Sequence, residues 1–292
     1  MELSTLRVFM TVANERSFSR AAEKLSRTQP AVSLALQRLE QDLGEKLLER
    51  SAKDVMLTDA GRTVLEYARR FQSLESELQN SIAELRDHSA GRLVVGANES
   101  TALYLLSHIE HFRRLYPRIK VQIRRSLSSR VPDEVVSGHL ELGVISYAPR
   151  DERIVSNVIY SDSLAFVVSP SHRLATRTEV PISELGEETF IAHNVLSPYR
   201  DIVIRSFHER GIPLNMDIEM PTVETIRWMV EQNAGVAFLP RMCVEQEIAE
   251  KRLVAVRVPE VEVVRKIYLI QPARRAVSYA AEAFLRLVKQ TK

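Results

Sequence analysis

The chain has 292 residues, of which 45% are hydrophobic and 27% charged, and its formal net charge is +2. This composition is ordinary for a soluble globular protein of two or three domains. Because Cys243 is the only cysteine, an internal disulfide is excluded and a cysteine-based zinc site is not expected. We expect no metal and no cofactor. No stretch is apolar over the length of a membrane span, and the N-terminus has no apolar signal core, so we expect a cytoplasmic protein.

The segment from Phe18 to Gln37, which follows an amphipathic helix predicted over residues 2–14, has the pattern of two helices joined by a tight turn. Its apolar residues recur at helical spacing up to Leu25, break off, and then resume. Thr28 suits the N-cap of the second helix, and Pro30 then lies in the first turn, where a missing N–H costs least. In a helix-turn-helix, the second helix lies in the major groove of DNA and its N-terminal residues meet base edges.

Charge alone does not identify this segment as DNA-binding. Residues 1–60 contain nine Lys/Arg and nine Asp/Glu side chains, so their net charge is zero. The basic residues are grouped, however, some ahead of the second helix and some after it, and such groups can contact phosphates. These basic residues are Arg16, Arg20, Lys24, Arg27, Arg50 and Lys53.

Two short apolar runs around a polar turn in residues 45–58 predict a β-hairpin wing. Thr58 then suits the cap of a helix from Asp59 to about Asp87, roughly 40 Å long at 1.5 Å per residue. Its apolar residues follow one heptad seam with a gap at Glu75, and we expect it to pair with the same helix of another subunit. The alternative is a helix folded onto its own domain. The seam residues are Val64, Ala68, Phe71, Leu78, Ile82 and Leu85.

A short hinge near residues 88–91 separates this helix from a region of alternating strands and helices. Over residues 92–145 the order is β-α-β-α-β, which predicts a mostly parallel sheet with helices on its faces. Farther along, the pattern predicts separate strands over residues 155–160 and 164–169, and a helix over residues 240–250.

Taken together, the chain resembles the LysR-type transcriptional regulators of bacteria over essentially all of its length. The specific part of the resemblance is the block LRVFMTVANERSFSRAAEKLSRTQPAVSLALQRLEQDLGEKLLER, followed by LTDAG. Looser matches lie at GHLELGVI, SHRLA and AGVAFLP. The resemblance implies an α/β fold class: an N-terminal winged helix-turn-helix with a long linker helix, then a two-lobed effector domain shaped like a type 2 periplasmic binding protein.

The resemblance also implies domain boundaries and partners. Family members form homodimers or homotetramers, bind an interrupted palindrome of double-stranded DNA in a promoter region, contact RNA polymerase, and act as activators or repressors. A small-molecule effector is expected between the two lobes. The implied domains are a winged helix-turn-helix over 1–58, a dimerising linker helix over 59–88, a hinge over 89–91 and an effector-binding domain over 92–292. The lobes take about 92–161 with 267–292, and about 162–266.

At the family's base-contacting positions the chain has a glutamine, a proline and a serine. Glutamine can bond adenine in a bidentate manner, serine can bond several base edges, and proline can touch a thymine methyl. Many relatives carry arginine where this chain has Leu34, so we expect one contact to differ here. The alternative is that these are ordinary surface residues. The residues expected to contact DNA are Thr28 (cap or phosphate contact), Gln29, Pro30, Ser33 and the wing arginine Arg50.

Ligands of α/β sheets bind beyond the carboxyl ends of strands, where helix N-termini supply N–H donors. Hydroxyl and amide side chains follow several predicted strands, and we expect them to hold a carboxylate or other oxyanion through neutral donors and helix dipoles. The alternative is simple N-capping, which needs the same residue types at the same places. The expected effector-binding residues are Ser100, Thr101, Ser128, Ser129, Ser146, Asn194, Ser197 and Thr222.

Two other functions fit an α/β scaffold less well. An enzyme would need catalytic or phosphate-binding motifs, and the sequence has no G-x-S-x-G, P-loop, G-x-G-x-x-G or H-E-x-x-H pattern. A DNA-bending protein without an effector would not need the large two-lobed part. Cys243 lacks a resolving cysteine, so we expect a buried apolar residue rather than a redox sensor.

Overall fold

The computed structural model describes residues 2–50, 55–86, 91–195 and 197–290. The chain folds into two compact units, the first over Met1–Asp87 and the second over nearly all of the remaining chain. The predicted hinge falls mostly on residues 87–90, outside the described residues. No helix in the described part of the chain is long and apolar enough to cross a membrane.

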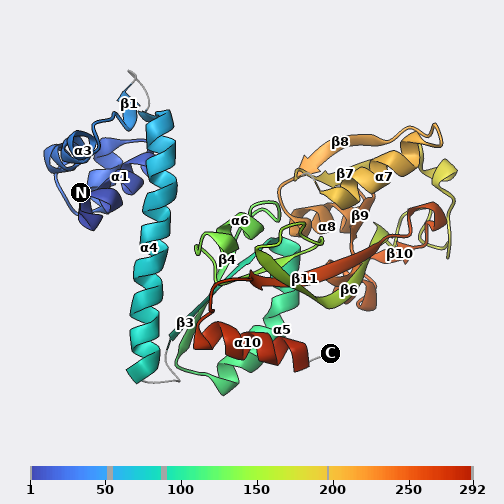
Figure 1. The fold of residues 1–292 in the computed structure, drawn as a ribbon. Coiled ribbons are helices and arrows are strands. Elements are labelled where there is room, and N and C mark those ends of the chain that lie inside the picture. Colours follow the sequence, from blue (N-terminus) through green and yellow to red (C-terminus); the bar gives the residue numbers. More distant parts are fainter. Residues whose placement is uncertain (1, 51–54, 87–90, 196, 291–292) are drawn as a thin grey trace. The chain divides into compact units, whose positions relative to one another are not determined.

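The first unit is a small helical bundle with a two-stranded wing and a long last helix (Figure 1). Its elements are α1 (Leu3–Glu15), α2 (Phe18–Lys24), α3 (Gln29–Leu43), β1 (Leu48–Arg50), β2 (Val55–Leu57) and α4 (Asp59–Arg86). Each helix buries one apolar face in a shared core, where the small Ala21 and Ala22 allow α2 to approach its neighbours closely. Leu65 and Ala68 from the start of α4 complete this core.

Capping residues decide where these helices begin and end. The Thr28 hydroxyl accepts a hydrogen bond from the Ala31 N–H at 3.4 Å, so the predicted N-cap of α3 is confirmed. Gly44 ends α3 with a φ of 73°, a left-handed conformation that favours glycine. The Thr58 hydroxyl accepts from the backbone N–H three residues later at 2.9 Å, which confirms the predicted start of α4.

The second unit is organised around a mixed sheet, and one part of it forms a lobe with helices on both faces (Figure 1). This part, lobe 1, has parallel pairing of β3 with both β4 and β5. Helices α5 and α10 cover one face around Phe112 and Phe284, and α6 covers the other with Val131 and Val135. Its elements are β3 (Gly91–Ala97), α5 (Glu99–Leu115), β4 (Ile119–Arg125), α6 (Val131–Val136), β5 (Leu142–Ile145) and α10 (Tyr279–Gln290).

The other part of the second unit, lobe 2, has its own apolar clusters around Phe190, Phe207 and Ile226. Its strands β7 and β8 pair in parallel, and β9 and β10 pair with the long strand described next. Instead of the helix predicted over 240–250, a 3-10 turn at Arg241–Cys243 precedes a short helix. The elements are β7 (Thr189–His193), α7 (Pro198–His208), β8 (Asn215–Met220), α8 (Val223–Glu231), β9 (Ala237–Pro240), α9 (Glu245–Ala249) and β10 (Val254–Val256).

Two long strands, β6 (Ile154–Val168) and β11 (Val264–Pro272), connect the lobes as an antiparallel pair. The prediction of two separate strands over 155–160 and 164–169 is therefore wrong, because one 15-residue strand spans both. The parallel pairing predicted for the strands of residues 92–145 is confirmed, whereas the sheet continues beyond them with antiparallel pairs of β11 with β5 and β6. The pairing skips Ile159, whose carbonyl accepts a hydrogen bond from the Tyr104 hydroxyl of α5 at 3.1 Å.

Candidate functional site

The first turn of α3 is a polar, exposed surface on a buried scaffold. Thr28, Gln29 and Pro30 are exposed and Ser33 is half-buried, whereas Val32, the residue before Ser33, is fully buried. The Gln29 Nε2 donates to the Ser33 Oγ at 3.0 Å, which holds these two side chains on one face. This turn therefore presents an amide and a hydroxyl together, as contact with base edges requires.

The other residues of the predicted DNA surface fall into three situations. The Thr28 hydroxyl is already the cap of α3, so a phosphate contact would have to share it. Leu34 is 49% exposed and places an apolar side chain next to this polar face. Arg50 ends β1, and its side chain lies outside the described residues.

Glu15 partly neutralises the predicted basic group ahead of α3. Lys24 lies 2.5 Å from a Glu15 carboxylate oxygen, and Arg20 donates to the Glu15 carbonyl at 2.6 Å. The hydrogen bond and charge of Lys24 lower the pKa of the half-buried Glu15 carboxyl. To contact a DNA phosphate, Lys24 would thus have to leave the Glu15 carboxylate.

Glu40 joins the end of α3 to the start of the wing. Its buried carboxylate accepts from the Leu47 N–H at 2.9 Å, the Leu48 N–H at 3.4 Å and the Lys46 ammonium at 3.0 Å. Burial on its own raises the pKa of this carboxyl, but the hydrogen bonds outweigh burial and lower it. Glu40 thus positions the wing relative to α3.

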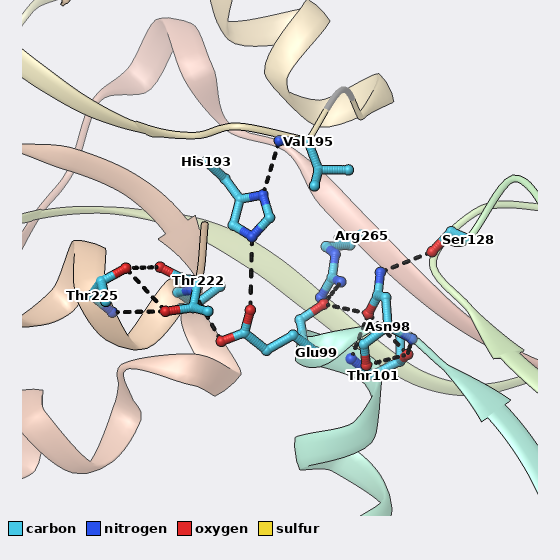
Figure 2. Close-up of polar contacts among 11 residues, drawn as sticks. Asn98, Glu99, Thr101, Ser128, His193, Val195, Thr222, Thr225 and Arg265 are labelled. Carbon is cyan, nitrogen blue, oxygen red and sulfur yellow. Dashed lines mark hydrogen bonds and ion pairs between the residues drawn. The ribbon is translucent and has the colours of Figure 1, made fainter. Parts of the chain in front are cut away.

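In the second unit, a polar cluster forms where α5 begins (Figure 2). The Asn98 side chain caps α5 by accepting from the Thr101 N–H at 2.9 Å, and it donates to the Ser128 hydroxyl at 2.8 Å. Thr101 is fully buried, and its hydroxyl also donates to the Val144 carbonyl at 3.1 Å. The structure therefore brings three predicted effector residues together, Ser100, Thr101 and Ser128, around an asparagine.

A buried ion pair between Arg265 and Asp162, which was not predicted from the sequence, contacts this cluster through Ser100. Arg265 in β11 is 3% exposed and lies 3.0 Å from the Asp162 carboxylate of β6. The same guanidinium donates to the Ser100 hydroxyl at 2.6 Å. Its charge also faces the ring of Tyr199 at 5.6 Å. The available signal was the alternation of β11, which puts residue 265 on the same inward face as Ile267.

Lobe 2 contributes the opposite side of the polar cluster. The Tyr199 hydroxyl donates to the carbonyl of Ser146, which is buried at the end of β5. Ser197 and Thr222 cap α7 and α8 through hydrogen bonds of 3.2 Å each, so for these two the capping alternative is seen in the structure. Ser129 and Asn194, the other two predicted residues, are exposed.

Glu99 extends from lobe 1 to lobe 2 in the same region (Figure 2). Its Oε1 accepts from the Val223 N–H at the start of α8 at 3.0 Å. Its Oε2 lies 3.7 Å from the Nε2 of His193 at the end of β7. Glu99 directly precedes the predicted residues Ser100 and Thr101 in sequence, yet its contact partners are more than ninety residues away.

Other parts of the second unit were also considered as possible reactive or ligand-binding sites. Cys243 is 4% exposed, and burial raises the pKa of its thiol to about 12, which fits the predicted buried apolar role. A hollow of about 570 Å³ lies in lobe 2 beside β6 and β10, but none of the predicted effector residues lines it. No group of three or more metal-binding side chains occurs among the described residues.

Comparison with protein families gives two matches that together cover most of the chain. Residues 3–62 match the model described as a bacterial regulatory helix-turn-helix protein of the lysR family. Residues 86–292 match the LysR substrate binding domain. Among curated relatives, the probable RuBisCO transcriptional regulator of Cyanidioschyzon merolae is 32% identical over 97% of this chain and 95% of its own. The RuBisCO operon transcriptional regulator of Allochromatium vinosum is 28% identical over 99% and 95%.

Solved structures agree in fold. CbnR complexed with its target DNA has a TM-score of 0.75 at 22% identity and covers 100% of both chains. Full-length OxyR from Pseudomonas aeruginosa has a TM-score of 0.61 at 22% identity and covers 99% of both. These relatives are transcriptional regulators and not enzymes.

Proposed function

Because the chain belongs to the LysR family of DNA-binding transcriptional regulators and carries the family's substrate-binding domain, we propose that it reads a specific DNA sequence under the control of a small anionic effector. In this proposal residues 1–58 bind DNA in the bacterial cytoplasm, 59–88 dimerise, and 89–91 form the hinge. Residues 92–292 bind the effector. The observation that carries the proposal is that one chain has both an exposed polar turn on α3 and a polar cluster formed by both lobes.

Sequence reading is assigned to Gln29, Pro30 and Ser33. The three lie in the first turns of α3, and in a helix-turn-helix these turns face the base edges of the major groove. Gln29 can form two hydrogen bonds with adenine once it releases Ser33. Thr28 and Arg50 are proposed to contact the DNA backbone, and the exposed Leu34 replaces a polar contact with an apolar one.

Dimerisation is assigned to the exposed stripe of α4. Beyond Ala68, the side chains of Phe71, Leu74, Leu78 and Ile82 are 42–62% exposed. An apolar stripe of this length on a 28-residue helix is stable when a second helix covers it. The gap at Glu75 has a local cause, since its carboxylate lies 3.2 Å from Arg7 of α1. Two such dimers would form a homotetramer that binds both halves of an interrupted palindrome and contacts RNA polymerase.

The effector is assigned to the polar cluster between the lobes, with Ser100, Thr101, Ser128, Ser129, Ser146, Asn194, Ser197 and Thr222 as its proposed contacts. Hydroxyls, two helix N-termini and a guanidinium converge there, and together they suit a carboxylate or another oxyanion. Binding would change the relative orientation of the lobes, and through the linker it would change the spacing of the DNA-binding units.

A ligand screen followed by footprinting tests this function. Small organic acids are screened by thermal shift of the full chain, and an effector should raise the melting temperature. That compound is then added to the regulator on its own promoter DNA, where we expect a change in footprint length or DNA bend. Identical footprints with and without a compound that binds would contradict control by the effector.

A further inference from the structure

Glu99 forms a contact between the lobes through a single carboxylate. The residue is the first of α5, whose apolar side packs in lobe 1. Its Oε1 accepts from Val223 N–H, the first N–H of α8, which packs in lobe 2. The carboxylate therefore links the N-terminus of α5 in lobe 1 to the N-terminus of α8 in lobe 2.

The groups that Glu99 contacts are donors that an oxyanion would use. The first N–H groups of a helix have no partner within the helix and carry partial positive charge. On the other side, the His193 Nδ1 accepts from the Val195 N–H at 3.1 Å, which leaves the proton of the neutral ring on Nε2. That Nε2–H faces the Glu99 carboxylate (Figure 2).

This contact is incomplete, which makes it replaceable. The Glu99 Oε2 is buried, yet it has no hydrogen-bond partner among the described residues, since His193 lies 3.7 Å away. A buried carboxylate oxygen without a hydrogen bond lowers the stability of the contact it belongs to. An oxyanion that filled both donor positions at normal distances would bind them better than Glu99 does.

We propose that Glu99 is an internal competitor of the effector: its carboxylate holds the lobes together in the ligand-free regulator, and an oxyanion of the effector displaces it. This inference rests on the effector-controlled function proposed above. It makes Glu99 the residue that sets the affinity for anions, because every anion that uses Val223 and His193 must first separate Glu99 from them.

Sulfate binding to the full chain tests this competition. Thermal-shift titrations with sodium sulfate, against sodium chloride at equal ionic strength, compare the wild type with Glu99→Ala, Glu99→Gln and Glu152→Ala. Glu152 is an exposed glutamate of the same unit and serves as the matched charge control. We expect the apparent Kd for sulfate to fall about tenfold in Glu99→Ala, by less in Glu99→Gln, and not at all in Glu152→Ala.

Hydrogen exchange supplies a second measurement on the same proteins. Without sulfate, exchange at the start of α8 should be faster in Glu99→Ala than in the wild type, and sulfate should slow it again. The proposal is overturned if both Glu99 variants bind sulfate as Glu152→Ala does, or if exchange in α8 is unchanged. If an effector still alters the footprint in that case, the effector function stands without the competitor. If the sulfate and exchange results hold but no effector alters the footprint, the competitor stands and effector control fails.

Discussion

The first turn of α3 and the polar cluster between the lobes contain similar side chains, but the first is open to solvent and the second is mostly buried. On α3, the polar groups of Thr28, Gln29 and Ser33 lie within five residues of one another and are exposed or half-buried, so water can reach them until DNA arrives. Between the lobes, Arg265, Asp162 and Ser100 come from three elements and are each at most 7% exposed. The first region can lose a side chain without loss of fold, whereas the second combines binding and stability in the same atoms.

The largest effect is expected at the buried ion pair. Arg265→Met leaves the Asp162 carboxylate buried without its cation, and we expect a loss of about 3–5 kcal/mol in the free energy of unfolding. Urea denaturation of the full chain measures this. The adjacent Lys266 is exposed, so Lys266→Met is the control and should change stability by less than about 0.5 kcal/mol. Equal losses in both variants would show that the pair does not stabilise the second unit.

A smaller loss is expected where α3 meets the wing. Glu40→Ala removes the acceptor for two backbone N–H groups, and we expect a loss of about 2–3 kcal/mol in the stability of the first unit. Because the folded-state pKa of Glu40 lies below the ordinary value of 4.5, its stabilisation is present above that pH and lost as pH falls through the lowered pKa. The difference from wild type should therefore shrink in acid. Glu45→Ala, at an exposed position, should show no such difference at any pH.

On α3 the effect should be on binding alone. Gln29→Ala should leave stability unchanged and reduce the preference for specific over random DNA by about 1–3 kcal/mol. Fluorescence anisotropy with both DNAs at one salt concentration measures it, and Gln37→Ala provides a matched glutamine on the same helix. An equal loss of affinity on specific and random DNA would mean that Gln29 only positions the protein.

The smallest effect is expected for chemical labelling of Cys243 in the folded protein. Because burial raises the pKa of the Cys243 thiol to about 12, the thiolate is scarce at neutral pH, and a thiol reagent should not label the folded protein. The same reagent should label one thiol per chain after unfolding in urea. Stoichiometric labelling of the folded protein would mean that lobe 2 opens around Cys243.

The contrast also explains which features could be predicted from the sequence. Thr28, Gly44 and Thr58 act through neighbours within four residues, so their capping roles follow from local pattern. Ser161, Asp162 and Ser163 lie between the two strands that were predicted, but in the fold they pair residue by residue with β11. Asp162 meets Arg265 a hundred residues later, and no local rule anticipates that meeting.

The same limit applied to the effector residues. Sequence reasoning selected hydroxyls that follow strands, and for Ser100, Thr101 and Ser128 this led to the polar cluster. It gave the same weight to Ser129 and Asn194, which are exposed. Glu99 is not among the predicted residues, and a carboxylate at a helix start is favoured by the helix dipole in any case. Its contact with Val223 depends on how the two lobes meet.

The unpaired Ile159 of β6 has a mechanical consequence for the second unit. Strands β6 and β11 connect both lobes, so any rotation of one lobe against the other must be absorbed by their backbones. The bulge interrupts the hydrogen-bonded ladder of this pair, so we expect the two strands to bend more easily there than elsewhere. Tyr104 bonds the freed carbonyl there, and it belongs to the same helix that carries Glu99 and Ser100. A ligand that moved α5 as a whole would therefore also move the side chain that bonds the bulge.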